Sequence, residues 1–186
     1  MSWFRRGSAP GGWTWPYTPD ARDRVVPVGD VPRVNEGAPL PVVVASEFRL
    51  SLVYLMQERP LDQDGSRMRI VSADTGDLLF AAVEFRHAHA HLFGPPNDET
   101  ILAHPLAGRG IHPNGAFAVE GSSWIRALER MNSVHEQHSP WRFRGLTHYL
   151  FTFIDSTFEC AAEDFTVSVH HGSLRDVVAE VAGRLE

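Results

Sequence analysis

Lysine is missing from this chain of 186 residues, so all 17 of its basic residues are arginine. Without a lysine amine there is no Schiff-base nucleophile, no pyridoxal phosphate anchor and no P-loop lysine. A Ser-Lys catalytic pair is excluded for the same reason. Composition alone therefore rules out several enzyme classes.

Cysteine and long apolar runs are also scarce. Cys160 is the single cysteine, so neither an intrachain disulfide nor a cysteine-based zinc cluster can form. No stretch approaches the roughly 18 consecutive apolar residues of a membrane helix. Arg5 and Arg6 are not followed by the apolar segment of a secretory signal. We therefore predict a cytoplasmic protein with no membrane partner.

Positive charge is limited, since the formal net charge is -6 at pH 7. Binding to phosphate backbones or anionic lipid needs a concentrated basic face. We therefore expect no nucleic-acid partner.

No complete catalytic motif is present. The chain has no Gly-rich phosphate loop, zinc-protease helix or calcium loop. Ser122 and Ser123 follow Gly121 without the flanking pattern of a nucleophile elbow, and helix capping explains them. Cys160, with His148 as a base, is a possible nucleophile, but a packed small hydrophobe is the favoured interpretation.

Proline and aromatic residues are concentrated in residues 1–41, which hold seven of the 13 prolines. Such density blocks helices and weakens sheets, so we predict an extended arm without regular structure. Its aromatic side chains include Trp3, Trp13, Trp15 and Tyr17. Because each can bury about 150 to 250 Å², we expect the arm to lie across its own domain. Docking on a partner is the alternative.

Residues 42–186 are predicted to form one α+β domain, with an antiparallel meander of about five to seven strands and two packed helices. Alternating apolar residues between 48 and 56 predict a half-buried strand. Residues 67–93 predict a hairpin with one long arm, turning at residues 73–76. Three further strands are expected at 148–154, 157–162 and 165–171.

Helical spacing occurs twice. Apolar residues and histidines recur at intervals of four and three residues from Trp124 to His138, after a capping serine and before Pro140. At the C-terminal end Ser173 caps a helix whose apolar side runs from Leu174 to Leu185. We expect this second helix to pack on the sheet.

The most distinctive stretch is Leu78–Phe93, LLFAAVEFRHAHAHLF, which predicts a long strand ending in three alternating histidines. Residues i and i+2 of a strand point the same way, about 6.6 to 6.8 Å apart. His87, His89 and His91 continue the more apolar face, so they line the core or a cavity that opens from it. With His148, they are our candidates for a ligand pocket.

A metal site is an alternative role for these histidines. Neighbouring members of the triplet can share one ion, but His87 and His91 are too far apart on a regular strand. The loop between Gly94 and Gly115 offers His104 and His112 as completing ligands for a divalent transition metal such as zinc.

These observations together favour a bacterial-type, non-catalytic binding or protein-interaction module over an enzyme. The alternatives are a metal-binding protein or metal-dependent enzyme that uses His87, His89 and His91, and a small-molecule carrier with a histidine-lined cavity.

Overall fold

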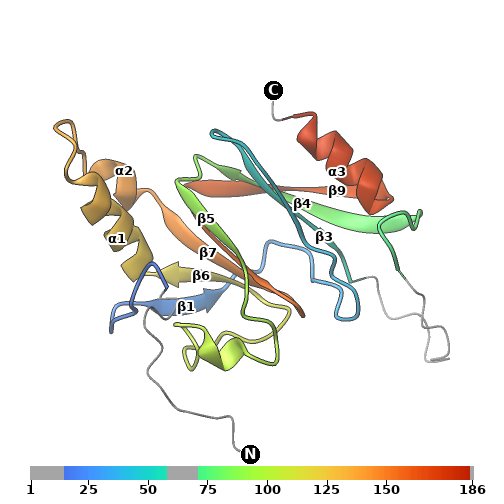
Figure 1. Ribbon diagram of the computed structural model, residues 1–186, viewed down its shortest axis with the longest axis horizontal. Helices are drawn as coiled ribbons and strands as arrows, with labels where there is room; N and C mark the ends of the chain where they lie inside the picture. Colours follow the sequence, from blue (N-terminus) through green and yellow to red (C-terminus); the bar gives the residue numbers. More distant parts are fainter. Residues whose placement is uncertain (1–14, 58–70, 185–186) are drawn as a thin grey trace, which may run out of the picture.

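A computed structural model describes residues 15–57 and 71–184 of the chain. Two antiparallel sheets pack face to face, and helices cover their outer faces (Figure 1). The predicted α+β class and antiparallel pairing are confirmed. The strands form two sheets rather than one, and the described residues contain nine strands.

The first sheet has five strands in the order β1-β6-β7-β8-β5. Their bounds are β1 Arg24–Pro27, β5 Ala90–Gly94, β6 Ala116–Glu120, β7 Thr147–Thr152 and β8 Thr157–Ala162. The second sheet has four strands in the order β2-β3-β4-β9. These are β2 Val42–Ala45, β3 Leu50–Leu55, β4 Leu78–Arg86 and β9 Asp164–Gly172.

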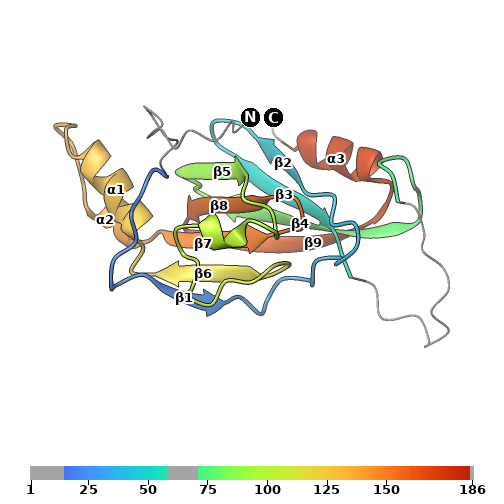
Figure 2. The ribbon, with the colours of Figure 1, turned by 60° about the horizontal axis from the view of Figure 1, so that its bottom comes forward.

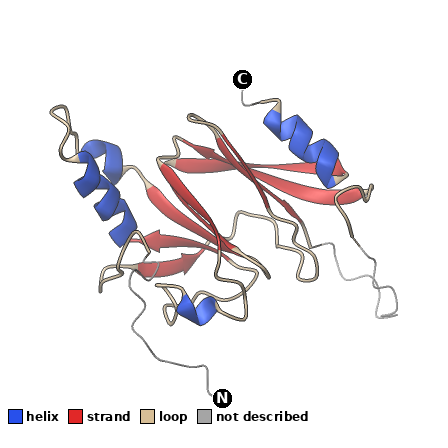
Figure 3. Cartoon of the chain, viewed as in Figure 1, coloured by secondary structure: helices blue, strands red, loops and turns tan. Residues whose placement is uncertain are grey.

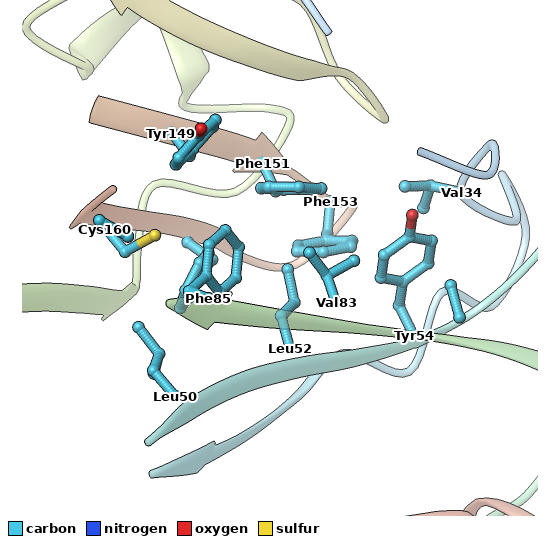
Figure 4. Packing of buried hydrophobic residues seen from close by; sticks show 13 residues of the cluster. Val34, Leu50, Leu52, Tyr54, Val83, Phe85, Tyr149, Phe151, Phe153 and Cys160 are labelled. Carbon is cyan, nitrogen blue, oxygen red and sulfur yellow. The ribbon is translucent and has the colours of Figure 1, made fainter. Parts of the chain in front are cut away.

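Period-two alternation explains the core between the sheets. Alternate residues of β3, β4, β7 and β8 point inward and form one cluster that includes Tyr54, Phe85 and Phe151 (Figure 4). Cys160 belongs to this cluster. Phe85 of β4 contacts the opposite sheet, with its ring centroid 6.1 Å from that of Phe151 and 5.4 Å from that of Phe158.

Helices form the two outer layers (Figures 2 and 3). Helix α3, Leu174–Ala182, covers the four-stranded sheet, and its Val177 and Val181 pack against Phe80. Helix α1, Ser123–Asn132, and the single turn α2, Trp141–Arg144, cover the five-stranded sheet. None of the helices in the described residues is long and apolar enough to cross a membrane.

Both predicted N-caps are confirmed. The Ser173 side chain accepts a hydrogen bond from the Asp176 amide, and the Ser122 side chain accepts one from the Ile125 amide. The apolar side of α3 lies on the sheet as predicted, although Leu185 is outside the described residues.

The prediction of one long strand over Leu78–Phe93 is wrong. Strand β4 ends at Arg86 and β5 begins at Ala90 in the other sheet. His87 has φ 49°, a left-handed conformation that ends the extended run. The three histidines therefore do not continue one face of a strand.

The first predicted helix is shorter than expected. It ends at Asn132 rather than continuing to His138, and the Ser133 hydroxyl donates to the Arg130 carbonyl at its last turn. Side-chain hydrogen bonds of this kind compete with helix continuation. Met131, which lies on the predicted stripe from Trp124 to His138, is exposed.

The arm contains regular structure within its described residues, 15–41. Strand β1 pairs with β6, and Tyr17 and Val34 are buried, so this part lies across its own domain as expected. The proline-free run Arg24–Val26 is long enough for a short edge strand. Residues 1–14, with Trp3 and Trp13, lie outside the described residues.

The strand pairing between residues 42 and 93 also differs. The predicted strand at 48–56 becomes β3, which follows a turn at Ser46 and is buried on both faces because α3 covers its outer side. Strand β4 pairs with β3 and β9, so both of its edges are occupied and it does not form the predicted hairpin. Residues 67–70 lie outside the described residues.

Candidate functional site

A buried polar cluster lies on the outer face of the five-stranded sheet. Within β8, Phe158, Cys160 and Ala162 face the inter-sheet core, so Glu159 points to the opposite side. Leu150 of β7 is its register partner, which places His148 on the same outer face, one diagonal step away. Both side chains are essentially inaccessible to solvent.

Three side chains from distant parts of the chain surround the Glu159 carboxylate. Its Oε2 atom accepts hydrogen bonds from the Tyr17 hydroxyl at 2.6 Å and from His148 Nε2 at 2.7 Å. His104 Nε2 lies 3.4 Å from Oε1. This last contact is long, and neither atom makes a regular hydrogen bond in the described part of the chain. We call Tyr17, His104, His148, Glu159 and Ser122 the Glu159 cluster.

The hydrogen bonds define where the protons of this cluster lie. His104 Nδ1 accepts from the Leu106 amide, so the proton of its neutral ring is on Nε2, facing Glu159. His148 Nε2 donates to the carboxylate, and its Nδ1 lies within hydrogen-bonding distance of Ser122 Oγ, at 3.0 Å.

The pKa values agree with an ionised carboxylate. Burial alone raises the pKa of Glu159, but the interactions with His104 and His148 outweigh it and lower the pKa to about 2. Burial and the neighbouring Glu159 carboxylate raise the pKa of Tyr17, which stays a donor. The cluster thus holds a buried negative charge at neutral pH.

Aromatic rings cover the cluster. Trp15 lies over His104 at 4.6 Å between ring centroids, and Trp124 contacts His148 edge-on at 4.9 Å. Tyr17 stacks on Trp124 at 5.9 Å. These contacts join the arm, the loop before β6 and helix α1 over one carboxylate.

The arm is fixed to α1 by a second set of polar contacts. Asp23 Oδ1 accepts from the Ser123 amide at 2.6 Å, so a carboxylate occupies the positive N-terminal end of the helix. Arg126 Nη2 pairs with Asp20 Oδ2 at 2.7 Å. Gly121 precedes the helix at φ 61°, and a Cβ there would collide with the Arg22 carbonyl.

Ser122 connects this cluster to a cavity of about 340 Å³ between α1, α2 and the ends of β6 and β7. Ile125, Phe143 and Thr147 line the same cavity. Ser122, His148 and Glu159 form a hydroxyl–imidazole–carboxylate chain. Such a chain is the arrangement that activates a serine nucleophile.

The three histidines of the sequence triplet lie apart. His87 pairs with Glu163 at 2.7 Å, His89 contacts the Phe143 ring at 5.2 Å, and His91 stacks on Phe158 at 6.5 Å. Burial lowers the pKa of His91. His112 packs edge-on against Phe117 at 5.0 Å.

Two of the proposed histidines do converge, since His104 and His148 both face Glu159. Within residues 15–57 and 71–184, no three His, Cys, Asp or Glu side chains are grouped so that they could hold a metal ion. Burial raises the pKa of Cys160 well above its usual value, and its thiol lies in the inter-sheet core away from His148.

Sequence reasoning missed Tyr17, Ser122 and Glu159 as members of a site. One signal was available for Glu159, because an acidic residue inside the apolar strand TFECAA needs a buried partner. Tyr17 is 142 positions away from Glu159, and no local pattern connects the two.

A second candidate surface lies at the far end of α1. Residues 131–141, which we call the helical tip, project beyond the sheets in both ribbon views (Figures 1 and 2). Three apolar side chains are largely exposed there: Met131 at 69 %, Val134 at 89 % and Trp141 at 73 %. The Arg144 guanidinium lies 4.4 Å from the centroid of the Trp141 ring.

No protein-family model, curated protein or solved structure matches this chain.

Proposed function

We propose that this protein is a non-catalytic protein-interaction module that binds its partner through the helical tip. The observation that carries the proposal is the concentration of exposed apolar side chains at that tip. Apolar residues gathered in one exposed place favour a contact surface, and tryptophan is enriched among residues that dominate binding energy.

The charge around the tip favours one kind of partner. Residues 129–144 contain three arginines and two glutamates, although the whole chain has a formal net charge of -6. We therefore propose a protein partner that offers an apolar pocket bordered by carboxylates. The Glu159 cluster supports this function indirectly, because it fixes the base of α1 on the sheet.

The proposal includes a cytoplasmic setting. Cys160 is a free, buried thiol, which suits a reducing compartment. Fractionation of the cells that make the protein tests this part.

Affinity purification of the full chain from those cells, with quantitative mass spectrometry, tests the proposed surface. We expect a partner that is recovered with the wild-type chain and at least about 30-fold less with Trp141→Asp or Val134→Asp, because a hot-spot residue contributes about 2 kcal/mol or more. Phe48→Asp is the matched control, since Phe48 is 83 % exposed at the turn before β3. Partners that respond equally to all three variants would contradict the proposal.

One observation favours a second function, hydrolysis through an acyl-serine. Ser122 Oγ would attack an ester carbonyl while His148 accepts its proton and Glu159 stabilises the imidazolium. Two features make this weaker than the interaction proposal. The Ser123 amide, which could hold an oxyanion, already donates to Asp23, and Ser122 itself caps α1.

A fluorophosphonate probe separates the two functions. In the hydrolase reaction Ser122 Oγ displaces fluoride from phosphorus, and intact-protein mass spectrometry would detect the adduct. The interaction proposal expects no adduct on the wild-type chain. Labelling that disappears in Ser122→Ala, while Ser123→Ala is still labelled, would replace it with the hydrolase function.

A further inference from the structure

Strand β9 forms one side of the four-stranded sheet, and its outer edge has no partner strand in the described part of the chain. All nine of its residues pair with β4 in continuous register, so it has no bulge. Its sequence DFTVSVHHG has no proline, and the chain has no lysine to place on the edge. A long, regular edge without these features is a template for another strand.

The pairing of β4 determines which backbone groups of β9 face outward. The Met56 amide donates to the Leu79 carbonyl, so odd-numbered residues of β4 hydrogen-bond toward β3 and even-numbered ones toward β9. The even-numbered residues of β9 are their partners and direct their N–H and C=O groups toward β4. Phe165, Val167, Val169 and His171 therefore direct their N–H and C=O groups to the open edge. In agreement, the Phe165 amide donates to its neighbour Asp164 Oδ1 at 2.7 Å instead of to a strand.

This edge is complementary to itself in one antiparallel register. With a two-fold axis at Val167, Val167 faces its own copy and Phe165 faces Val169, so apolar residues meet. The same register places Asp164 opposite His170, so an acidic residue meets an imidazole at each end of the pairing. A two-fold axis at Ser168 or Val169 leaves Asp164 without such a neighbour.

The exposed side chains on β9 fit the same register. Val169 is 55 % exposed although it lies on the inner face of its sheet with Phe165 and Val167. Pairing across the two-fold axis covers Val169 with the partner's Phe165.

We propose that two copies of this chain pair antiparallel along β9, with the two-fold axis at Val167, and that the four-stranded sheets join into one continuous sheet of eight. Backbone hydrogen bonds supply most of the attraction, and the alternating side chains select the register. This interface is separate from the helical tip, so it stands independently of the proposed function.

Sedimentation or light scattering of the full chain at about 100 µM tests the dimer, with circular dichroism to confirm folding. We expect twice the mass of one chain for wild type and one chain for Val167→Pro, because its amide faces the open edge and makes no bond to β4. Val169→Arg, at an exposed position, is expected to give the same result. Phe48→Arg is the control and stays dimeric. A monomeric wild-type chain, or a dimer that survives Val167→Pro and Val169→Arg, overturns the proposal.

Oxidative cross-linking tests the register. Residues 166 and 168 face each other across the axis as a non-hydrogen-bonded pair, with Cα atoms about 4.5 Å apart. A mixture of Thr166→Cys and Ser168→Cys chains is therefore expected to cross-link at least about tenfold faster than Thr166→Cys alone, since Cα atoms more than about 7 Å apart are not bridged readily. Cys160 is buried and does not compete. Equal rates overturn the proposed register.

Discussion

Helix α1 joins two regions that have opposite relations to water. At its N-terminal end Ser122 enters a cluster where a carboxylate, two imidazoles and a phenol are excluded from solvent. At its other end Met131 and the rest of the helical tip expose apolar side chains. Buried charge is tolerated only when it is paired, whereas exposed apolar surface costs the isolated chain little. Substitutions in the first region should change stability, and those in the second should change binding.

Glu159→Ala should lower the free energy of unfolding strongly. It leaves His148 and Tyr17 without their shared acceptor and His104 without the carboxylate that it faces. A buried donor left without a partner costs about 1 to 3 kcal/mol, so the two lost hydrogen bonds together cost about 2 to 6 kcal/mol. We expect the free energy of unfolding, measured by urea denaturation, to fall by that amount. Glu163→Ala is the control, because its carboxylate forms an exposed pair with His87 and its loss should cost about 1 kcal/mol or less. Similar losses in both variants would show that the cluster is not a stabilising centre.

Lowering the pH should reduce the contribution of Glu159 to the free energy of unfolding over a defined range. The pKa of Glu159 is lowered in the folded state from 4.5 to about 2, so its contribution is complete above about pH 4.5 and is lost as pH falls toward 2. The shift corresponds to about 3 kcal/mol. Urea denaturation of wild type and Glu159→Gln at steps between pH 6 and pH 2 measures it. The stability difference between the two chains should shrink by that amount, and a constant difference would contradict the ionised carboxylate.

Tyr17→Phe should have an intermediate effect. It removes one hydrogen bond to the carboxylate but retains the aromatic ring that stacks on Trp124. Hydrogen bonds to charged groups contribute about 1.5 to 3 kcal/mol, so we expect a loss of about 2 kcal/mol in urea denaturation. Tyr149→Phe is a suitable comparison on the inner face of the neighbouring strand. If the Tyr17 variant were as stable as wild type, the arm would not be held by this bond.

Local patterns in the sequence predicted much of the fold. The caps at Ser122 and Ser173 and the strands β7, β8 and β9 follow from spacing and residue type over short stretches. The division into two sheets did not follow, because β4 pairs with strands that lie far away in sequence on both sides. Non-local pairing depends on the whole fold, which a period-two pattern does not specify.

The candidate site was less predictable for the same reason. The HAHAH pattern favoured one strand, but the left-handed turn at His87 separates its members, and φ at a non-glycine residue has no clear signature in sequence. His104 and His148 were recognised as candidates, but their common partner Glu159 was not. Its neighbours come from the arm, a loop and another strand. The same limit applies to the helical tip, where Met131 shares the predicted stripe with Trp124 by spacing but is exposed.

Trp141→Ala should have the smallest effect on stability. It therefore tests most sharply whether the helical tip, unlike the buried Glu159 cluster, serves binding and not folding. Trp141 is 73 % exposed, and its one described ring interaction is with Arg144. Exposed cation–π contacts contribute about 0.5 to 1 kcal/mol, so the free energy of unfolding should fall by no more than about 1 kcal/mol. Partner recovery should nevertheless fall at least about 30-fold, as for other tryptophan hot spots.

Trp124→Ala is the matching substitution at a buried tryptophan, since Trp124 packs against His148 and Tyr17. It should cost about 3 to 5 kcal/mol in stability, as other buried tryptophans do. If Trp141→Ala instead destabilised the chain as much as Trp124→Ala, the helical tip would be part of the folded core. Its exposed apolar side chains would then be no evidence for a binding surface.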